Sequence, residues 1–104
     1  MEKKDSFLLS GIKVIDAASF IAGPSAATIM SDYGADVIKI EPQTGDSLRN
    51  LIANGRMPEG PENYCWELTS RNKKSISLNL KDKEAHNILI GLIREADVFV
   101  TNMP

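Results

Sequence analysis

The chain has 104 residues, enough for one small domain, and its 25% charged and 42% hydrophobic residues are typical of a globular protein. The formal net charge of −2 gives no overall attraction to nucleic acid or to an anionic membrane. One cysteine, Cys65, excludes an internal disulfide and a cysteine-based metal cluster, and one histidine, His86, limits a zinc site to a single imidazole. The apolar runs are too short for a signal-peptide core or a membrane span, so we expect a cytoplasmic protein.

The first part of the chain predicts a strand, a helix and a second strand. Residues 13–16 (KVID) form a short apolar run, and residues 36–40 form another. Between them, Pro24 suits the first helical position, whose N–H has no helical partner, and Gly34 suits a left-handed helix end. The apolar residues that we expect on the buried face of this helix are Ala26, Ala27, Ile29, Met30 and Tyr33.

The last third of the chain repeats this pattern. Residues 75–80 alternate between polar and apolar side chains, which predicts a third strand, and residues 97–101 predict a fourth. Asp82 can cap the intervening helix, and His86 lies off its apolar side. Strands alternating with helices indicate an α/β fold with a Rossmann-like, mostly parallel sheet and flanking helices. The core-facing stripe of the last helix is expected to be Ala85, Ile88, Leu89, Leu92 and Ile93.

Residues 43–70 interrupt the pattern with several glycines and prolines. A structureless loop of this length is uncommon in a compact domain. Two alternatives remain open: short helices near residues 48–54 and 62–69, or a functional loop over the ligand edge. We expect Tyr64, Cys65 and Trp66 to pack beneath this segment. A final apolar strand with few helices to cover the sheet suggests that the chain is the incomplete N-terminal part of a larger domain.

Two candidate ligand contacts lie where the first two strands end. Residues 19–25 (SFIAGPS) place backbone N–H groups at a helix start, which suits a phosphate or an acyl carbonyl; the alternative is an ordinary strand-to-helix turn. Glu41 ends the second strand, where dinucleotide-binding domains bind a ribose hydroxyl. The glycine fingerprint of such domains is absent, which disfavours NAD. Glu41 is otherwise a solvated carboxylate or a salt-bridge partner of Lys39 or Arg49.

Further candidates flank the third and fourth strands. Asn102 follows the fourth strand and is either a ligand contact or a turn residue. We assign Asp16 a structural role, because no histidine or lysine near it in sequence forms an evident pair. A local cationic edge that suits phosphate groups, or that merely solubilises the strand ends, is formed by Arg71, Lys73, Lys74, Lys81 and Lys83.

Four ordered segments resemble one known family. The sequences GIKVIDAASFIAGPSAATIMSDYGADVIKIEP, GDSLRN, SRNKKSISLNL and ADVFVTN are similar to the N-terminal part of the family III CoA-transferases. That family includes formyl-CoA, carnitine and bile-acid CoA-transferases and α-methylacyl-CoA racemase. The resemblance runs from Leu9 to Asn102. It implies that residues 1–104 form an N-terminal CoA-binding segment and that the full-length protein is a homodimer of interlinked chains.

The resemblance also implies positions for the coenzyme. Residues 19–22 would lie near the CoA thiol and the acyl group, and formyl-CoA transferase carries other residues at positions 19 and 21, which disfavours oxalate and formyl-CoA as substrates. Pro42 stands where an arginine is found there, and Gln43 or Arg71 would compensate. The residues expected to contact CoA, including two from the cationic segment, are Ser19, Ile21, Ala22, Leu78, Lys81, Asn102, Arg71 and Lys74.

The implied activity is transfer of CoA between an acyl-CoA and a carboxylic acid through an aspartyl mixed anhydride. The aspartate of this chemistry would lie beyond the chain, so no catalytic residue and no metal ligand is assigned within it. The chain alone is expected to be inactive and to self-associate through uncovered sheet surface. The alternatives are an α-methylacyl-CoA racemase-like epimerase, a non-catalytic nucleotide-binding module and a dinucleotide-dependent oxidoreductase.

Overall fold

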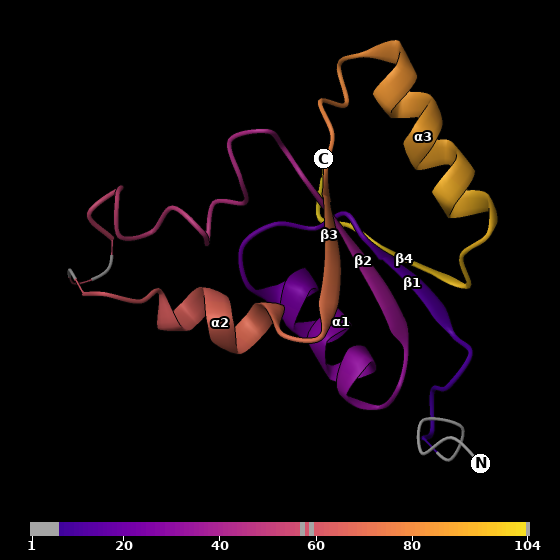
Figure 1. The fold of residues 1–104 in the computed structure, drawn as a ribbon, viewed down its shortest axis with the longest axis horizontal. Coiled ribbons are helices and arrows are strands. Elements are labelled where there is room, and N and C mark those ends of the chain that lie inside the picture. The colour runs from indigo at the N-terminus through magenta and orange to yellow at the C-terminus, as the bar shows by residue number, and fades with distance from the viewer. Residues whose placement is uncertain (1–6, 57, 59, 104) are drawn as a thin grey trace.

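The computed structural model describes residues 7–56, 58 and 60–103 and arranges four strands in one parallel sheet (Figure 1). The strands are β1 (Lys13–Asp16), β2 (Asp36–Glu41), β3 (Lys73–Ser77) and β4 (Val98–Val100). The helices are α1 (Ala22–Asp32), α2 (Tyr64–Ser70) and α3 (Lys83–Arg94). The strand order is β3-β2-β1-β4, and each neighbouring pair is parallel. The expected parallel α/β fold is therefore confirmed.

The strand order places all four strand exits on one edge of the sheet. Asp16 at the end of β1 lies level with Lys39 in β2 and Val100 in β4. Along the chain, β2 and β3 are added on one side of β1, whereas β4 is added on its other side. The direction in which strands are added therefore reverses between β1 and β4. Ligands of open parallel sheets bind beside such a point. We call the edge where the strands end the carboxyl edge, and the opposite one the amino edge.

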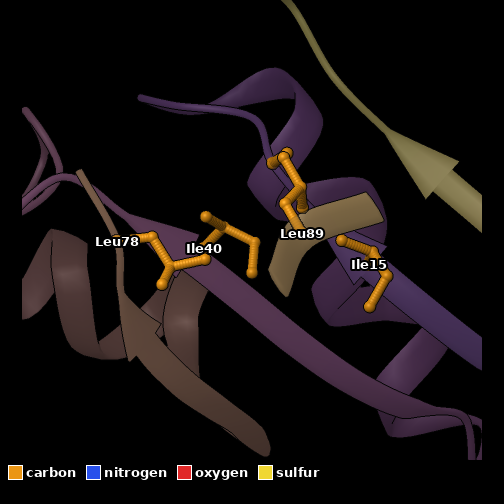
Figure 2. Close-up of a cluster of buried hydrophobic side chains, with 5 residues drawn as sticks. Ile15, Ile40, Leu78 and Leu89 are labelled. Carbon is orange, nitrogen blue, oxygen red and sulfur yellow. The ribbon is translucent and has the colours of Figure 1, made fainter. Parts of the chain in front are cut away.

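Helices lie on both faces of the sheet. On one face, α1 packs on Val14 and Val37 through Ala27, and α2 packs against α1. On the other face lies α3, seen apart from α1 and α2 in Figure 1. The buried cluster beneath α3 includes Ile15, Ile40, Leu78 and Leu89, whose side chains converge in Figure 2.

The third strand lies two to three residues earlier than the alternation predicts. The prediction was residues 75–80, whereas β3 spans Lys73–Ser77. Its start is set by pairing, because Lys73 and Lys74 lie opposite Val37 and Ile38. Beyond β3, Leu78 N donates one further backbone hydrogen bond to Glu41 O, at 2.9 Å. Glu41 is the last residue of β2 and is followed by Pro42. The partner strand, rather than side-chain polarity, fixes both ends of β3.

Helix α1 buries a different side from the one predicted. It begins at Ala22, so Pro24 lies within its first turn rather than at its first position. Ile29 and Tyr33 are 56% and 53% exposed, whereas Thr28 and Ser31 are buried. The two hydroxyls tolerate burial because they donate to Pro24 O and Thr28 O at 2.9 and 2.7 Å. Ala26 is also exposed.

The predicted C-terminal end of α1 and the predicted N-terminal cap of α3 are confirmed. Gly34 follows α1 with a φ of 103°, the left-handed conformation that favours glycine. Asp82 caps α3 by accepting a hydrogen bond from Glu84 N at 2.9 Å. His86 is exposed as expected, but Ile88, predicted to face the core, is 49% exposed.

The segment between β2 and β3 is held by its own small core. The expected second helix is confirmed as α2, whereas residues 48–54 form turns rather than a helix. Leu48 and Leu51 are buried there, and Cys65 and Trp66 pack against them as predicted. Tyr64 is 60% exposed, contrary to expectation. Among the helices of the described residues, none is long and apolar enough to cross a membrane.

Candidate ligand-binding site

A pocket of about 250 Å³ opens at the carboxyl edge. Every strand exit contributes to it, because its lining includes Ala18 and Ser19 after β1, Pro42 after β2, Leu80 after β3 and Met103 after β4. Its position agrees with the rule that parallel sheets bind ligands beyond the ends of their strands.

The loop between β1 and α1 forms one wall of this pocket and is held tightly in place. Asn102 makes two hydrogen bonds to Ser19: its Oδ1 accepts from Ser19 N at 3.0 Å, and its Nδ2 donates to Ser19 O at 2.8 Å. Ala17 N donates to Val100 O at 2.9 Å. Phe20 has a φ of 70°, a conformation that is uncommon for an aromatic residue. The exit of β4 thus fixes the loop that leaves β1.

A buried cluster of charges lies behind this loop, on the face covered by α1. Asp16 and Asp46 flank Lys39, with Nζ–Oδ2 distances of 3.6 and 3.5 Å, and all three side chains are at most 2% exposed. Lys73 approaches Asp16 Oδ2 to 2.9 Å and also donates to Pro24 O at 2.8 Å. We call these four residues the Asp–Lys cluster. Burial lowers the pKa of Lys73, although the hydrogen bond to Asp16 opposes that effect.

The Asp–Lys cluster also forms hydrogen bonds with the backbone of the β1–α1 loop. Lys39 Nζ donates to Ala18 O at 3.0 Å, and Asp16 Oδ1 accepts from Ala18 N at 3.1 Å. Asp46 Oδ1 accepts from Phe20 N at 3.2 Å. Backbone groups of Ala18 and Phe20 are therefore satisfied by buried charged side chains rather than left free for a ligand.

Glu41 is buried and pairs with Arg49, which confirms the salt-bridge interpretation with Arg49 rather than Lys39 as the partner. The solvated-carboxylate interpretation is wrong. The Glu41 carboxylate accepts two hydrogen bonds from Arg49, at 3.0 and 3.1 Å, one from Ser75 Oγ at 2.6 Å and one from Asp46 N at 3.0 Å. Burial alone would raise the pKa of Glu41, but these hydrogen bonds outweigh it and lower the pKa from 4.5 to about 2. Arg49 also lies 4.0 Å above the Trp66 ring, a cation–π contact.

Most of the residues expected to contact CoA lie at the carboxyl edge. Ser19 lines the pocket, and Asn102 binds its backbone. Ile21 and Ala22 are exposed at the start of α1, and Lys81 is exposed just beyond β3. Leu78 differs, because its side chain is only 8% exposed and packs beside Ile40 in the core (Figure 2).

Arg71 and Lys74 do not join these residues. Arg71 precedes β3 and pairs with Asp32, at the end of α1, with an N–O distance of 2.6 Å. Lys74 lies near the start of β3 and pairs with Asp36 at 3.3 Å. Both therefore lie at the amino edge.

The single cationic edge expected around the third strand is wrong. Arg71 precedes β3 and Lys74 is its second residue, whereas Lys81 and Lys83 follow the strand, so the two pairs lie toward opposite edges of the sheet. Lys73 is buried and neutralised by Asp16. Positive charge is thus divided between the edges.

Sequence reasoning missed the Asp–Lys cluster as a unit. It assigned Asp16 a structural role but found no partner, because Lys39 and Lys73 are distant in sequence. One signal was present in the sequence, because Lys39 interrupts the apolar run of β2. In a parallel pairing of β1 and β2, Lys39 lies opposite Asp16 on the same face of the sheet. A lysine in the middle of a buried strand requires a buried counter-charge.

Gly23 allows the start of α1 to approach the β1–α1 loop. A Cβ at this position would lie 2.4 Å from Ala18 Cβ, well inside van der Waals contact. We expect Gly23→Ala to lower the free energy of unfolding by about 1–3 kcal/mol, as overpacking in a core does. Urea denaturation measures this change. Gly91→Ala on α3, where a Cβ meets nothing within 4 Å, is the control and should be neutral or stabilising; equal effects of the two substitutions would contradict the close packing at Gly23.

These features define a parallel α/β fold with a pocket at the strand exits on the carboxyl edge. The chain belongs to CoA-transferase family III, whose family model matches residues 9–104.

Curated and solved relatives agree with this membership. The chain is 47% identical over 97 residues to the (R)-2-hydroxy-4-methylpentanoate CoA-transferase of Clostridioides difficile, covering 92% of the chain and 24% of that protein. It is 45% identical over 96 residues to the cinnamoyl-CoA:phenyllactate CoA-transferase of Clostridium sporogenes, covering 91% and 23%. A CAIB/BAIF family protein of Brucella suis has a TM-score of 0.79 at 31% identity, covering 93% and 26%. The chain thus spans about a quarter of the length of these relatives.

Proposed function

We propose that this chain is the CoA-binding N-terminal part of a CoA-transferase that moves CoA between an acyl-CoA and a carboxylic acid. The observation that carries the proposal is a pocket built from all four strand exits in a member of CoA-transferase family III. The strand order β3-β2-β1-β4 supports a Rossmann-like start of a larger domain.

In this proposal the chain binds and orients CoA, and the reactive carboxylate comes from elsewhere in the protein. Ser19, Ile21 and Ala22 lie beside the thiol end, where the exposed start of α1 offers N–H groups to an acyl oxygen. Lys81 supplies a charge-assisted contact to a phosphate. Asn102 acts through Ser19, whose backbone it holds on both sides.

NAD binding is disfavoured by the state of Glu41. A ribose-binding carboxylate must be free to accept from the sugar hydroxyls, whereas this one already accepts from Arg49, Ser75 and Asp46. The curated relatives above are named as CoA-transferases, which favours transfer over the racemase-like epimerisation. A homodimer, a cytoplasmic location and self-association of the chain alone belong to the same proposal. They rest on the family resemblance, on the shortness of the apolar runs and on the expected uncovered sheet surface, respectively.

Titration calorimetry with CoA, NAD and ATP tests which of these nucleotides the protein binds. We expect CoA to bind best and Lys81→Met to weaken CoA binding by about tenfold, the loss of one charge-assisted hydrogen bond. The matched control is Lys13→Met, which removes an exposed lysine at the start of β1, on the amino edge, and should leave CoA affinity unchanged. Tight NAD binding without CoA binding would overturn the proposal.

Assays of turnover test the reaction. The full-length enzyme should transfer CoA from an acyl-CoA to a carboxylic acid; (R)-2-hydroxy-4-methylpentanoate and phenyllactate are the first acceptors to try, because the two curated relatives are named for them. The 104-residue chain alone should show no turnover, and detectable turnover by it would contradict the absence of a catalytic group from this segment.

A further inference from the structure

The GDSLRN segment, residues 45–50, contains a carboxylate whose contacts reach beyond its own loop. Asp46 is 2% exposed and follows β2, yet its Oδ1 accepts from Phe20 N in the β1–α1 loop at 3.2 Å as well as from Leu48 N at 2.9 Å. Its Oδ2 lies 3.5 Å from Lys39 Nζ. One side chain therefore joins the exits of β1 and β2. Asp46 also lines the pocket itself, together with Ser19 after β1 and Pro42 after β2.

The Phe20 backbone needs such a partner. A φ of 70° is strained for an aromatic residue, and such a conformation persists only where surrounding contacts hold it in place. The hydrogen bond from Phe20 N to a buried carboxylate is of the strong, charge-assisted kind. Asp46 is itself held in place, because its own N–H donates to Glu41 Oε1 at 3.0 Å and Arg49 binds that same carboxylate.

We infer that Asp46 is a positioning residue for the CoA pocket: it fixes the β1–α1 loop at Phe20, and through that loop the placement of Ser19, without touching the reacting atoms. The inference rests on the proposed function, since it concerns the pocket assigned to CoA. Through Asp46, the GDSLRN segment would connect the exits of β1 and β2 into one binding surface.

Two variants of the full-length enzyme separate positioning from stability. Asp46→Ala removes the acceptor of the Phe20 N–H. Asp46→Asn keeps one acceptor oxygen for that N–H and replaces the other carboxylate oxygen with an uncharged NH2 group. Val37→Ala serves as the control for general destabilisation, because Val37 is 1% exposed in the α1-side core and lies outside the pocket. The measurements are hydrogen exchange of peptides covering residues 17–22 and the separate values of KM for the acyl-CoA and kcat.

For Asp46→Ala we expect faster exchange at residues 17–22 and a KM raised about tenfold, with a smaller change in kcat. Asp46→Asn should lie closer to the unsubstituted enzyme in both hydrogen exchange and KM. Val37→Ala should neither speed exchange specifically at residues 17–22 nor raise KM. The inference is wrong if exchange at residues 17–22 is unchanged in Asp46→Ala, or if Val37→Ala raises KM equally. A raised KM without faster exchange would mean that Asp46 acts on the ligand directly, which also overturns it.

These outcomes are distinct from failure of the proposed function. If the unsubstituted enzyme does not bind CoA, the proposed function fails. The exchange experiment still decides whether Asp46 holds the loop, because it requires no ligand.

Discussion

Replacing Lys39 with methionine is expected to lower the free energy of unfolding by about 3–5 kcal/mol, the usual cost of removing one partner from a buried ion pair. Lys39 lies between Asp16 and Asp46 and is 1% exposed. Without it, two buried carboxylates share only Lys73, and Ala18 O loses its donor at 3.0 Å. Urea denaturation at neutral pH measures the loss.

Two further variants test that explanation. Lys74→Met removes the neighbouring β3 lysine, which is 73% exposed and pairs with Asp36, and should cost less than about 1 kcal/mol. The double variant Lys39→Met/Asp46→Asn restores the balance of buried charge and should recover part of the stability lost in Lys39→Met. A Lys39→Met protein as stable as Lys74→Met would show that the Asp–Lys cluster is not desolvated.

Replacing Glu41 with glutamine is expected to cost about 2–3 kcal/mol at neutral pH, and the cost should disappear in acid. The pKa of Glu41 lies at about 2 in the folded protein against an ordinary 4.5, which corresponds to at most about 3 kcal/mol. Between these two pH values the unfolded chain binds more protons than the folded one. The carboxylate therefore stabilises the fold fully above pH 4.5, and this contribution is lost as the pH falls toward 2.

Unfolding free energies of the unsubstituted and Glu41→Gln proteins, measured from pH 7 down to pH 2.5, should converge at the acid end. Glu62→Gln, which alters an exposed carboxylate, should run parallel to the unsubstituted protein throughout. A stability difference for Glu41→Gln that stays constant down to pH 2.5 would mean that packing, rather than the ionised carboxylate, is responsible.

Local sequence signals were sufficient to predict the strand and helix limits that depend on one short segment of the chain. The apolar runs gave β1 and β2 almost to the residue, because a buried strand in a parallel sheet must be apolar. Gly34 marked the end of α1, and Asp82 marked the start of α3, since each depends on only a few neighbouring backbone groups. The family resemblance was carried by the order and spacing of four such segments.

Pairing between distant segments decided the rest. The limits of β3 follow from β2, and the buried side of α1 follows from the hydroxyls of Thr28 and Ser31, which satisfy themselves within the helix. Arg71 and Lys74 lie at the amino edge, away from Lys81, because β3 runs between residues that are close in sequence.

The amino-acid sequence by itself determined the parallel α/β class, most of the strands and the family, because these depend on local hydrophobic periodicity and on ordered motifs. Only the tertiary structure decided that Lys39 lies between Asp16 and Asp46, that Lys73 pairs with Asp16, and that Asn102 holds Ser19. Burying a charge is favourable only when an opposite charge arrives from another part of the chain, so a property of the assembled fold governs which residues shape the pocket.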